Sequence, residues 1–171
     1  MLRKIISGGQ TGVDQAALRA ALQADLLIGG WCPPGRECEA GRIPAQFPLR
    51  ETRWDRSPGA PDIPRSFRTE CNVRDAQATL IITSRNIGAD IATLDKGTGW
   101  TANCAARFAK PCYQVHVSDR EASDKIAIWI NRLAIDTLNV AGPSENTATG
   151  IGESAFGVLL RAFTQAKNTL P

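Results

Sequence analysis

The hydrophobic positions of this chain form two alternating kinds of pattern. Short apolar or β-branched runs, typical of buried strands, occupy residues 3–6, 25–30, 78–83, 112–117 and 137–141. Segments that are rich in helix formers or have one apolar face occupy residues 14–22, 66–75, 102–109, 121–133 and 152–167. Strands that alternate with helices predict an α/β fold, in which a doubly wound, mostly parallel sheet carries helices on both faces. The pattern leaves the structure of residues 90–95 open.

The segment from 31 to 65 interrupts this alternation. It holds seven of the ten prolines and shows no sustained period of either kind. A loop of this length in a compact domain is usually functional or disordered. Because Trp31, Phe47 and Trp54 give it side chains to pack with, we expect an ordered flap, with a plain surface loop as the alternative. The 171 residues, 43% of them hydrophobic, predict a single domain, 1–171, with a long loop insertion at about 31–65.

Charge and composition narrow the possible partners. The net charge of +3 arises from 20 basic and 17 acidic residues spread along the chain, without the basic run of a nucleic-acid-binding arm. No apolar run approaches the roughly 20 residues of a membrane span, and the first residues lead directly into a strand. We therefore expect a cytoplasmic protein that binds neither nucleic acid nor membranes. The five cysteines have no disulfide-framework or metal-site spacing and are expected to be reduced.

A glycine-rich turn joins the first strand to the first helix. It consists of Gly8, Gly9, Gln10, Thr11 and Gly12. Bare backbone N–H groups at the positive end of a helix favour an anion, so we expect a phosphate-bearing small molecule to bind here. The alternative is a turn that needs glycine for its geometry alone. A side chain at Gly9 should reduce affinity more than stability, unless Gly9 has a positive φ angle.

The first turn departs from two familiar nucleotide signatures. Its G-G-x-x-G spacing is not the dinucleotide fingerprint G-x-G-x-x-G, and the second strand ends without an acidic residue, which disfavours NAD. Gly12 is followed by Val13 and Asp14 rather than by the Lys-Ser/Thr of a Walker loop, which disfavours ATP hydrolysis. A generic phosphate cradle remains.

A second glycine-rich turn precedes the helix expected at 102–109. Gly97, Thr98, Gly99 and Thr101 offer a further set of N–H and hydroxyl donors. Because loops that follow parallel strands gather at one edge of the sheet, the glycine-rich turns should meet there. Candidate counter-charges, each equally well read as a solvated surface side chain, are Arg36, Arg74 and Lys96.

Catalytic constellations are scarce. His116 lies within an expected strand, and Ser7 and Ser144 have no apparent histidine partner, so we assign no catalytic residue. Four carboxylates near the loops could accept hydrogen bonds from a ligand or cap helices. They are Asp14, Asp75, Asp95 and Glu145.

Five stretches, in the right order, carry a family resemblance. They are GGQTGVDQAAL, GGWCPPGRECEAGRIP, RTECNVRDAQATLI, KGTGWT and LNVAGPSE. With them the chain resembles the molybdenum cofactor carrier proteins, a branch related to the lysine decarboxylase-like phosphoribohydrolases. The resemblance implies a Rossmann-like fold and a homo-oligomer, dimer or tetramer, which binds the molybdenum cofactor, a phosphorylated pterin, and protects it for delivery to molybdoenzymes.

The resemblance also implies a set of site residues. The segments 8–12 and 97–101 would hold oxyanions of the cofactor, and Arg36 and Glu145 would border the same cleft. The loop that begins at Gly142 would contribute to it, and Asp75, Asn139 and Glu145 are candidate partners of the pterin ring.

The enzymatic relatives supply rival interpretations. Of their P-G-G-x-G-T-x-x-E signature only part is present: Thr101 stands where the catalytic glutamate would be. Threonine cannot stabilise positive charge on a sugar, so binding is favoured over hydrolysis. The alternatives are a nucleotide-processing hydrolase that uses Asp14, Asp75 or Asp95 instead, and a nucleotide-sensing regulatory module.

Overall fold

Five parallel strands form the centre of the molecule. The computed structural model describes residues 1–84 and 95–168. Its main sheet contains β1 (Lys4–Ile6), β2 (Leu27–Gly29), β7 (Ala78–Thr83), β8 (Cys112–His116) and β9 (Thr137–Ala141). The strand order is β2-β1-β9-β7-β8, and all four neighbouring pairs are parallel. The predicted α/β fold is confirmed.

The strand order is that of a permuted Rossmann sheet. If β9 is counted as the first strand, followed by β1, β2, β7 and β8, the order β2-β1-β9-β7-β8 reads 3-2-1-4-5. The last strand of the chain therefore occupies the position of the first strand of a Rossmann fold. The order reverses between β9 and β7, which is the point where such sheets bind ligands.

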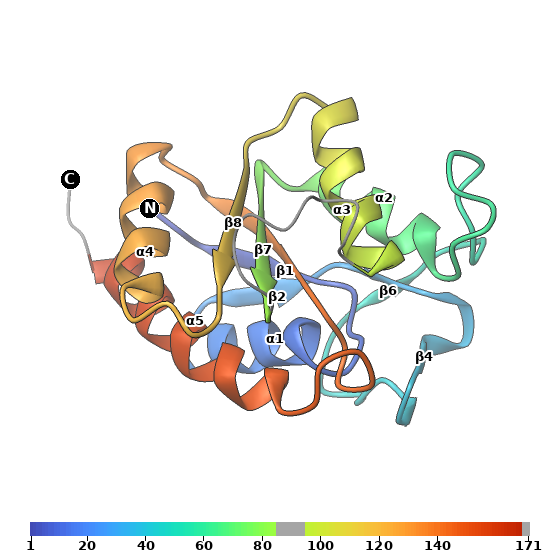
Figure 1. Ribbon diagram of the computed structural model, residues 1–171, viewed down its shortest axis with the longest axis horizontal. Coiled ribbons are helices and arrows are strands. Elements are labelled where there is room, and N and C mark those ends of the chain that lie inside the picture. Colours follow the sequence, from blue (N-terminus) through green and yellow to red (C-terminus); the bar gives the residue numbers. More distant parts are fainter. Residues whose placement is uncertain (85–94, 169–171) are drawn as a thin grey trace.

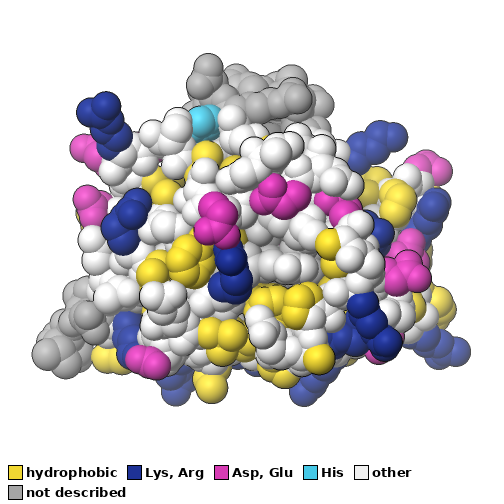
Figure 2. Space-filling model, turned by 90° about the horizontal axis from the view of Figure 1, so that it is seen from below, with side chains coloured by type: hydrophobic (Ala, Val, Ile, Leu, Met, Phe, Trp, Pro, Cys, Tyr) yellow, Lys and Arg dark blue, Asp and Glu magenta, His cyan; other side chains and the backbone are white. Residues whose placement is uncertain are grey.

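Helices cover both faces of this sheet (Figure 1). One layer contains α1 (Val13–Gln23), α4 (Ala122–Arg132) and α5 (Ile151–Asn168), and the other contains α2 (Ser66–Asp75) and α3 (Lys96–Arg107). The main core lies between the first layer and the sheet, where Leu138 and Val140 of β9 belong to the same cluster as Phe163 of α5. Seen from below, apolar side chains are interspersed with basic and acidic ones (Figure 2). Among the described residues, no helix has the length and apolar character to cross a membrane.

The start of α3 corrects one prediction. The segment Gly97–Thr101 lies in the first turns of this helix rather than in a loop before it. Asp95 caps the helix, because its carboxylate accepts bonds from the N–H (3.0 Å) and the hydroxyl (2.6 Å) of Thr98. The two glycines suggested a turn, but this cap and the burial of Trp100 beneath α2 outweigh their low helix propensity. Of the open segment 90–95, only Asp95 belongs to the described residues.

Residues 31–65 form a flap with short pairings and an apolar cluster of its own. The strands β3 (Trp31–Cys32) and β6 (Arg50–Glu51) pair in parallel, and β4 (Glu37–Cys38) and β5 (Gly41–Arg42) form a small hairpin after the 3-10 turn Pro34–Arg36. The cluster consists of Leu18, Cys32, Cys38, Ile43, Phe47 and Leu49. The flap is thereby attached to α1, which contributes Leu18.

Arg36 fastens the flap from within. Its guanidinium donates to the carbonyl oxygens of Leu49 (2.9 Å), Phe47 (2.9 Å) and Pro44 (3.3 Å). These three bonds join the 3-10 turn to residues 44–49 in the middle of the flap. The side chain that was expected to border a ligand is therefore used to hold the loop.

Replacing Arg36 should weaken the fold. Arg36→Met keeps the apolar stem but leaves three carbonyl groups without their charged donor, so we expect the free energy of unfolding to fall by about 2–4 kcal/mol. Urea unfolding followed by circular dichroism measures this. Arg42→Met, at an exposed position of the same segment, is the control and should change stability by less than about 0.5 kcal/mol. Equal effects of the two substitutions would show that Arg36 does not fasten the flap.

Candidate functional site

A polar cleft lies where the strand order reverses. The described residues enclose about 160 Å³ there, between the end of β9, the first glycine turn and the start of α3. It is lined by Gln10, Asp14, Glu39, Pro64, Arg65, Arg68, Thr69, Asp95, Gly97, Thr98, Thr101, Ala141, Gly142, Ser144 and Thr147. Residues of both glycine-rich segments, 8–12 and 97–101, therefore meet at one cleft.

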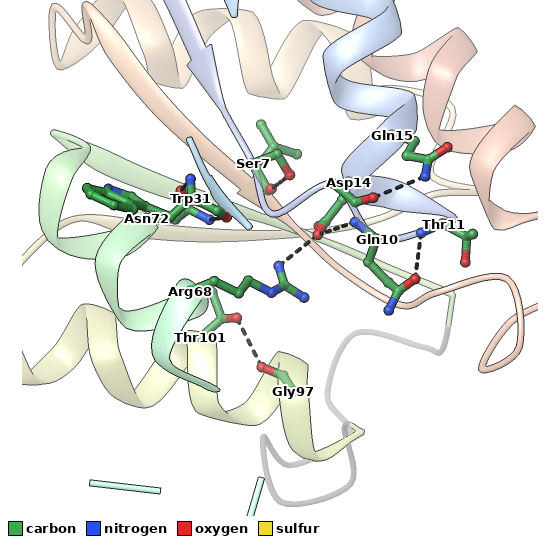
Figure 3. A network of polar contacts seen from close by, with 12 residues as sticks. Ser7, Gln10, Thr11, Asp14, Gln15, Trp31, Arg68, Asn72, Gly97 and Thr101 are labelled. Atoms are coloured by element: carbon green, nitrogen blue, oxygen red, sulfur yellow. Dashed lines mark hydrogen bonds and ion pairs between the residues drawn. The ribbon is translucent and has the colours of Figure 1, made fainter. Parts of the chain in front are cut away.

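An ion pair forms the inner wall of the cleft. Arg68 of α2 reaches across Gly8, and its Nη1 lies 2.8 Å from Oδ2 of Asp14 at the start of α1 (Figure 3). A Cβ atom on Gly8 would collide with this guanidinium, so glycine leaves the space through which Arg68 reaches Asp14. Burial raises the pKa of the Asp14 carboxyl and outweighs the opposing effects of Arg68 and of the Gln10 N–H group. Nε of Arg68 is buried and has no hydrogen-bond partner within the described residues.

The carboxylate of Glu39 joins three distant segments at the rim. Its Oε2 accepts bonds from the Thr11 hydroxyl (2.8 Å) and the Asn146 N–H (3.2 Å), and its Oε1 accepts one from the Ser144 hydroxyl (2.5 Å). The N–H of Glu39 donates to Oε1 of Gln10 at 2.9 Å. Burial would raise the pKa of Glu39, but the bonds from Ser144, Thr11 and Asn146 lower it. The hairpin of the flap thus places a negative charge between the first and last loops.

The helix ends near the cleft are also occupied by carboxylates of the chain. Glu145 caps α5, because its two oxygens accept bonds from the N–H groups of Gly150 (2.8 Å) and Gly152 (2.7 Å). Asp14 accepts a bond from the N–H of Gln10 at 3.2 Å. In the first glycine-rich turn, which was expected to offer bare N–H groups, the N–H of Gln10 is therefore already bonded to an acidic side chain of the chain itself.

The cleft contains only part of the predicted set. Gln10, Asp14, Gly97, Thr98, Thr101 and Gly142 line it. The others lie around or away from it: Gly8, Gly9, Thr11, Gly12, Arg36, Arg74, Asp75, Lys96, Gly99, Asn139 and Glu145.

Three of these residues have other partners. Arg74 and Asp75 pair with each other at the end of α2, with Nε and Oδ1 2.7 Å apart. Asn139 is buried in the sheet and donates to the Thr79 hydroxyl at 3.3 Å.

Arg65, Arg68, Glu39 and Ser144 are lining residues that sequence reasoning did not select for binding. A signal for Arg68 exists, because Arg68 and Asn72 are four residues apart on one face of α2 and both are polar within a packed helix. Asn72 is almost completely buried and holds the backbone of Trp31 through two hydrogen bonds. For Glu39 no local signal exists, because its partners Ser144 and Asn146 lie more than 100 residues away.

Comparison with known proteins agrees with this architecture. A family model described as the circularly permutated YpsA SLOG family matches residues 5–163. A crystal structure from Syntrophus aciditrophicus SB, of a "putative molybdenum carrier protein", has a TM-score of 0.78 and 33% identity, with 95% of this chain and 94% of that chain covered. No curated protein shows significant similarity to the chain. The permutation in the family description corresponds to the position of β9 at the end of the chain.

Gly9 serves the fold rather than the entry of a ligand. It has a φ of +77°, and an added Cβ would lie 2.6 Å from Cδ1 of Leu49 in the flap cluster. A side chain at Gly9 would therefore point at the flap. Because Gly9 has a positive φ angle, a substitution there is expected to weaken folding as well as ligand binding.

Gly9→Ala should consequently lower the free energy of unfolding by about 2–4 kcal/mol, the sum of backbone strain and a collision with the flap. Gly41→Ala is the matched control: φ is +102°, but no atom of the described residues lies within 4 Å of its added Cβ. It should cost only the strain, about 1–2 kcal/mol. Chemical unfolding of both variants tests this, and a loss at Gly9 no larger than at Gly41 would contradict the packing argument.

Proposed function

The chain belongs to the circularly permuted YpsA SLOG family, and we propose that it binds and carries a phosphate-bearing small molecule without transforming it. The molybdenum cofactor is the favoured ligand, because a relative with 33% identity over 95% of the chain carries the name of a putative molybdenum carrier. The cleft at the reversal of strand order is the proposed binding site.

One observation carries this proposal: an anionic group of the chain already occupies the rim. The hydroxyls of Thr11 and Ser144 and the N–H of Asn146 converge on the two oxygens of the Glu39 carboxylate. Donors that satisfy a carboxylate also suit the oxygens of a phosphate, which carries more charge. We therefore treat the Glu39 carboxylate as an internal group that takes the place of the ligand's charged group. The Thr11, Ser144 and Asn146 donors must release this carboxylate when the ligand binds.

Two arginines supply the positive charge that a phosphate requires. Arg65 lines the cleft, forms no ion pair within the described ranges and lowers the pKa of the Glu39 carboxyl through its charge, in addition to the larger effects named above. Arg68 is paired with Asp14, but its Nε is still without a partner there. A phosphate near Glu39 would thus meet hydroxyls, an amide and guanidinium groups together.

The volume of the cleft indicates which part of the ligand enters. About 160 Å³ is less than the roughly 300–1,000 Å³ of pockets that enclose whole drug-sized molecules. The phosphate end would therefore enter the cleft, and the pterin ring would extend toward its opening. We also propose that the protein is a homo-oligomer and that it delivers the cofactor to molybdoenzymes.

A carrier role is favoured over hydrolysis by the state of the carboxylates. Asp14 is paired with Arg68, and Asp95 is used to cap α3. Asp75 lies outside the cleft and is paired with Arg74. Each of the three carboxylates that could replace the catalytic glutamate of a hydrolase is thus bonded to another residue of the chain.

Arg65→Met tests the proposed cleft. Loss of the cation should weaken binding of inorganic phosphate about tenfold in isothermal titration, while thermal stability changes little. Arg120→Met, an exposed arginine outside the cleft, is the control and should bind phosphate as the wild type does.

Mass spectrometry of small molecules that co-purify from cells able to make the pterin cofactor should find a phosphorylated pterin, and less of it with Arg65→Met. If the protein shows no saturable phosphate binding and no phosphorylated compound co-purifies with it, the proposed function is refuted.

Glu39→Gln tests the role of the internal carboxylate. Removal of its charge weakens its bonds to Ser144 and Thr11 and ends its repulsion of the incoming anion, so phosphate should bind about five- to tenfold more tightly. Glu37→Gln in the same hairpin removes one charge at an exposed position and should leave the affinity unchanged. If Glu39→Gln binds phosphate no better than the wild type, Glu39 does not compete with the ligand, even though the cleft itself binds.

A further inference from the structure

A second cavity lies over β1 and β2, away from the cleft. It encloses about 390 Å³, and among the residues that the structure describes it shares no lining residue with the first site. Its floor includes Lys4 and Ile6 of β1 and Gly29 of β2, and its walls come from Trp31, Arg50 and Asp75. The volume falls within the roughly 300–1,000 Å³ typical of small-molecule pockets.

Two cations of this second cavity lack acidic partners. Within the part of the chain that the structure describes, neither Lys4 nor Arg50 forms an ion pair. The Lys4 side chain lies across Gly29, where an added Cβ would be 3.3 Å from Cε and 3.5 Å from Nζ. Glycine therefore leaves space for the ammonium group on the floor. The acidic residue of the lining, Asp75, is ion-paired with Arg74 and accepts a bond from Trp31, and it forms no ion pair with Lys4 or Arg50 within the described residues.

Trp31 provides a rigid flat wall. Its backbone N–H donates to Oδ1 of Asn72 (2.7 Å), and its carbonyl accepts a bond from Nδ2 of the same residue (3.0 Å). The indole Nε1 donates to Asp75 at 2.7 Å, which fixes the ring as well. The guanidinium of Arg50 lies 6.0 Å from the centre of the indole ring. An aromatic surface held at both ends and a cation over its face are thus prepared before any ligand arrives.

We infer that this cavity is a second binding site, which takes a flat aromatic or heteroaromatic anion. The ring of such a ligand lies against Trp31 and Pro48, and its carboxylate or phosphate lies between Lys4 and Arg50. The site is independent of the cleft proposed above. It also gives a role to Asp75, which the sequence predicted as a binding residue and which here orients the indole.

The indole N–H signal of Trp31 is a direct reporter of this site. In ¹⁵N-labelled protein, titration with pterin-6-carboxylate should shift this signal in a saturable way, and unsubstituted pterin, which lacks the anion, should have a much weaker effect. Loss of the signal in Trp31→Phe assigns it. Lys4→Met and Arg50→Met should each weaken the binding about tenfold, since each removes one charge-assisted contact.

Two further variants make the result specific. Arg42→Met removes an exposed positive charge from the flap and should bind pterin-6-carboxylate as the wild type does. Arg65→Met acts on the first cleft and should also leave the Trp31 response unchanged. A Trp31 signal that does not shift, or a shift that persists in both Lys4→Met and Arg50→Met, would overturn the second site. A response that is lost only with Arg65→Met would assign the ligand to the first cleft instead.

Discussion

The contact of the Glu39 carboxylate with donors from both ends of the chain is the interaction around which the cleft is built. Thr11 follows β1, Ser144 and Asn146 follow β9, and Glu39 belongs to the flap. These segments meet because β9, the last strand, lies between β1 and β7. In an unpermuted Rossmann sheet the first loop of the chain would supply such donors alone. Here they are divided between residues 8–12 and 142–146, so the cleft depends on the complete sheet.

The fold could be predicted from the sequence because its signals are local. The bounds of α2, β7 and β9 agree with the hydrophobic pattern, since β7 and β9 are short apolar or β-branched runs and α2 is a segment of helical character between them and the flap. The convergence of the glycine-rich segments followed from the rule that ligands bind at the carboxyl ends of parallel strands. The helical state of residues 97–101 was missed because their two glycines pointed to a turn. The Asp95 cap is a local signal that the glycine content concealed, whereas the burial of Trp100 is a tertiary effect.

The chemistry of the cleft was harder to foresee because its partners are far apart in the sequence. Arg68 pairs with Asp14 across 54 residues, and Glu39 meets Ser144 across 105. Conversely, Arg36 looked like a ligand for phosphate but holds the flap through three backbone carbonyls. A glycine-rich turn identifies where an anion is favoured, but only the structure shows which anion, here a carboxylate of the chain itself. For a proposed carrier, such an internal competitor would offset part of the affinity and ease release of the ligand.

The most direct test of this account is a crystal structure of the protein soaked with tungstate, whose anomalous signal locates an oxyanion without ambiguity. We predict the tungstate within hydrogen-bond distance of the Thr11 and Ser144 hydroxyls and the Asn146 N–H, with the Glu39 side chain turned away. Tungstate bound elsewhere, with Glu39 still bonded to Thr11 and Ser144, would contradict the claim that these donors form the anion site.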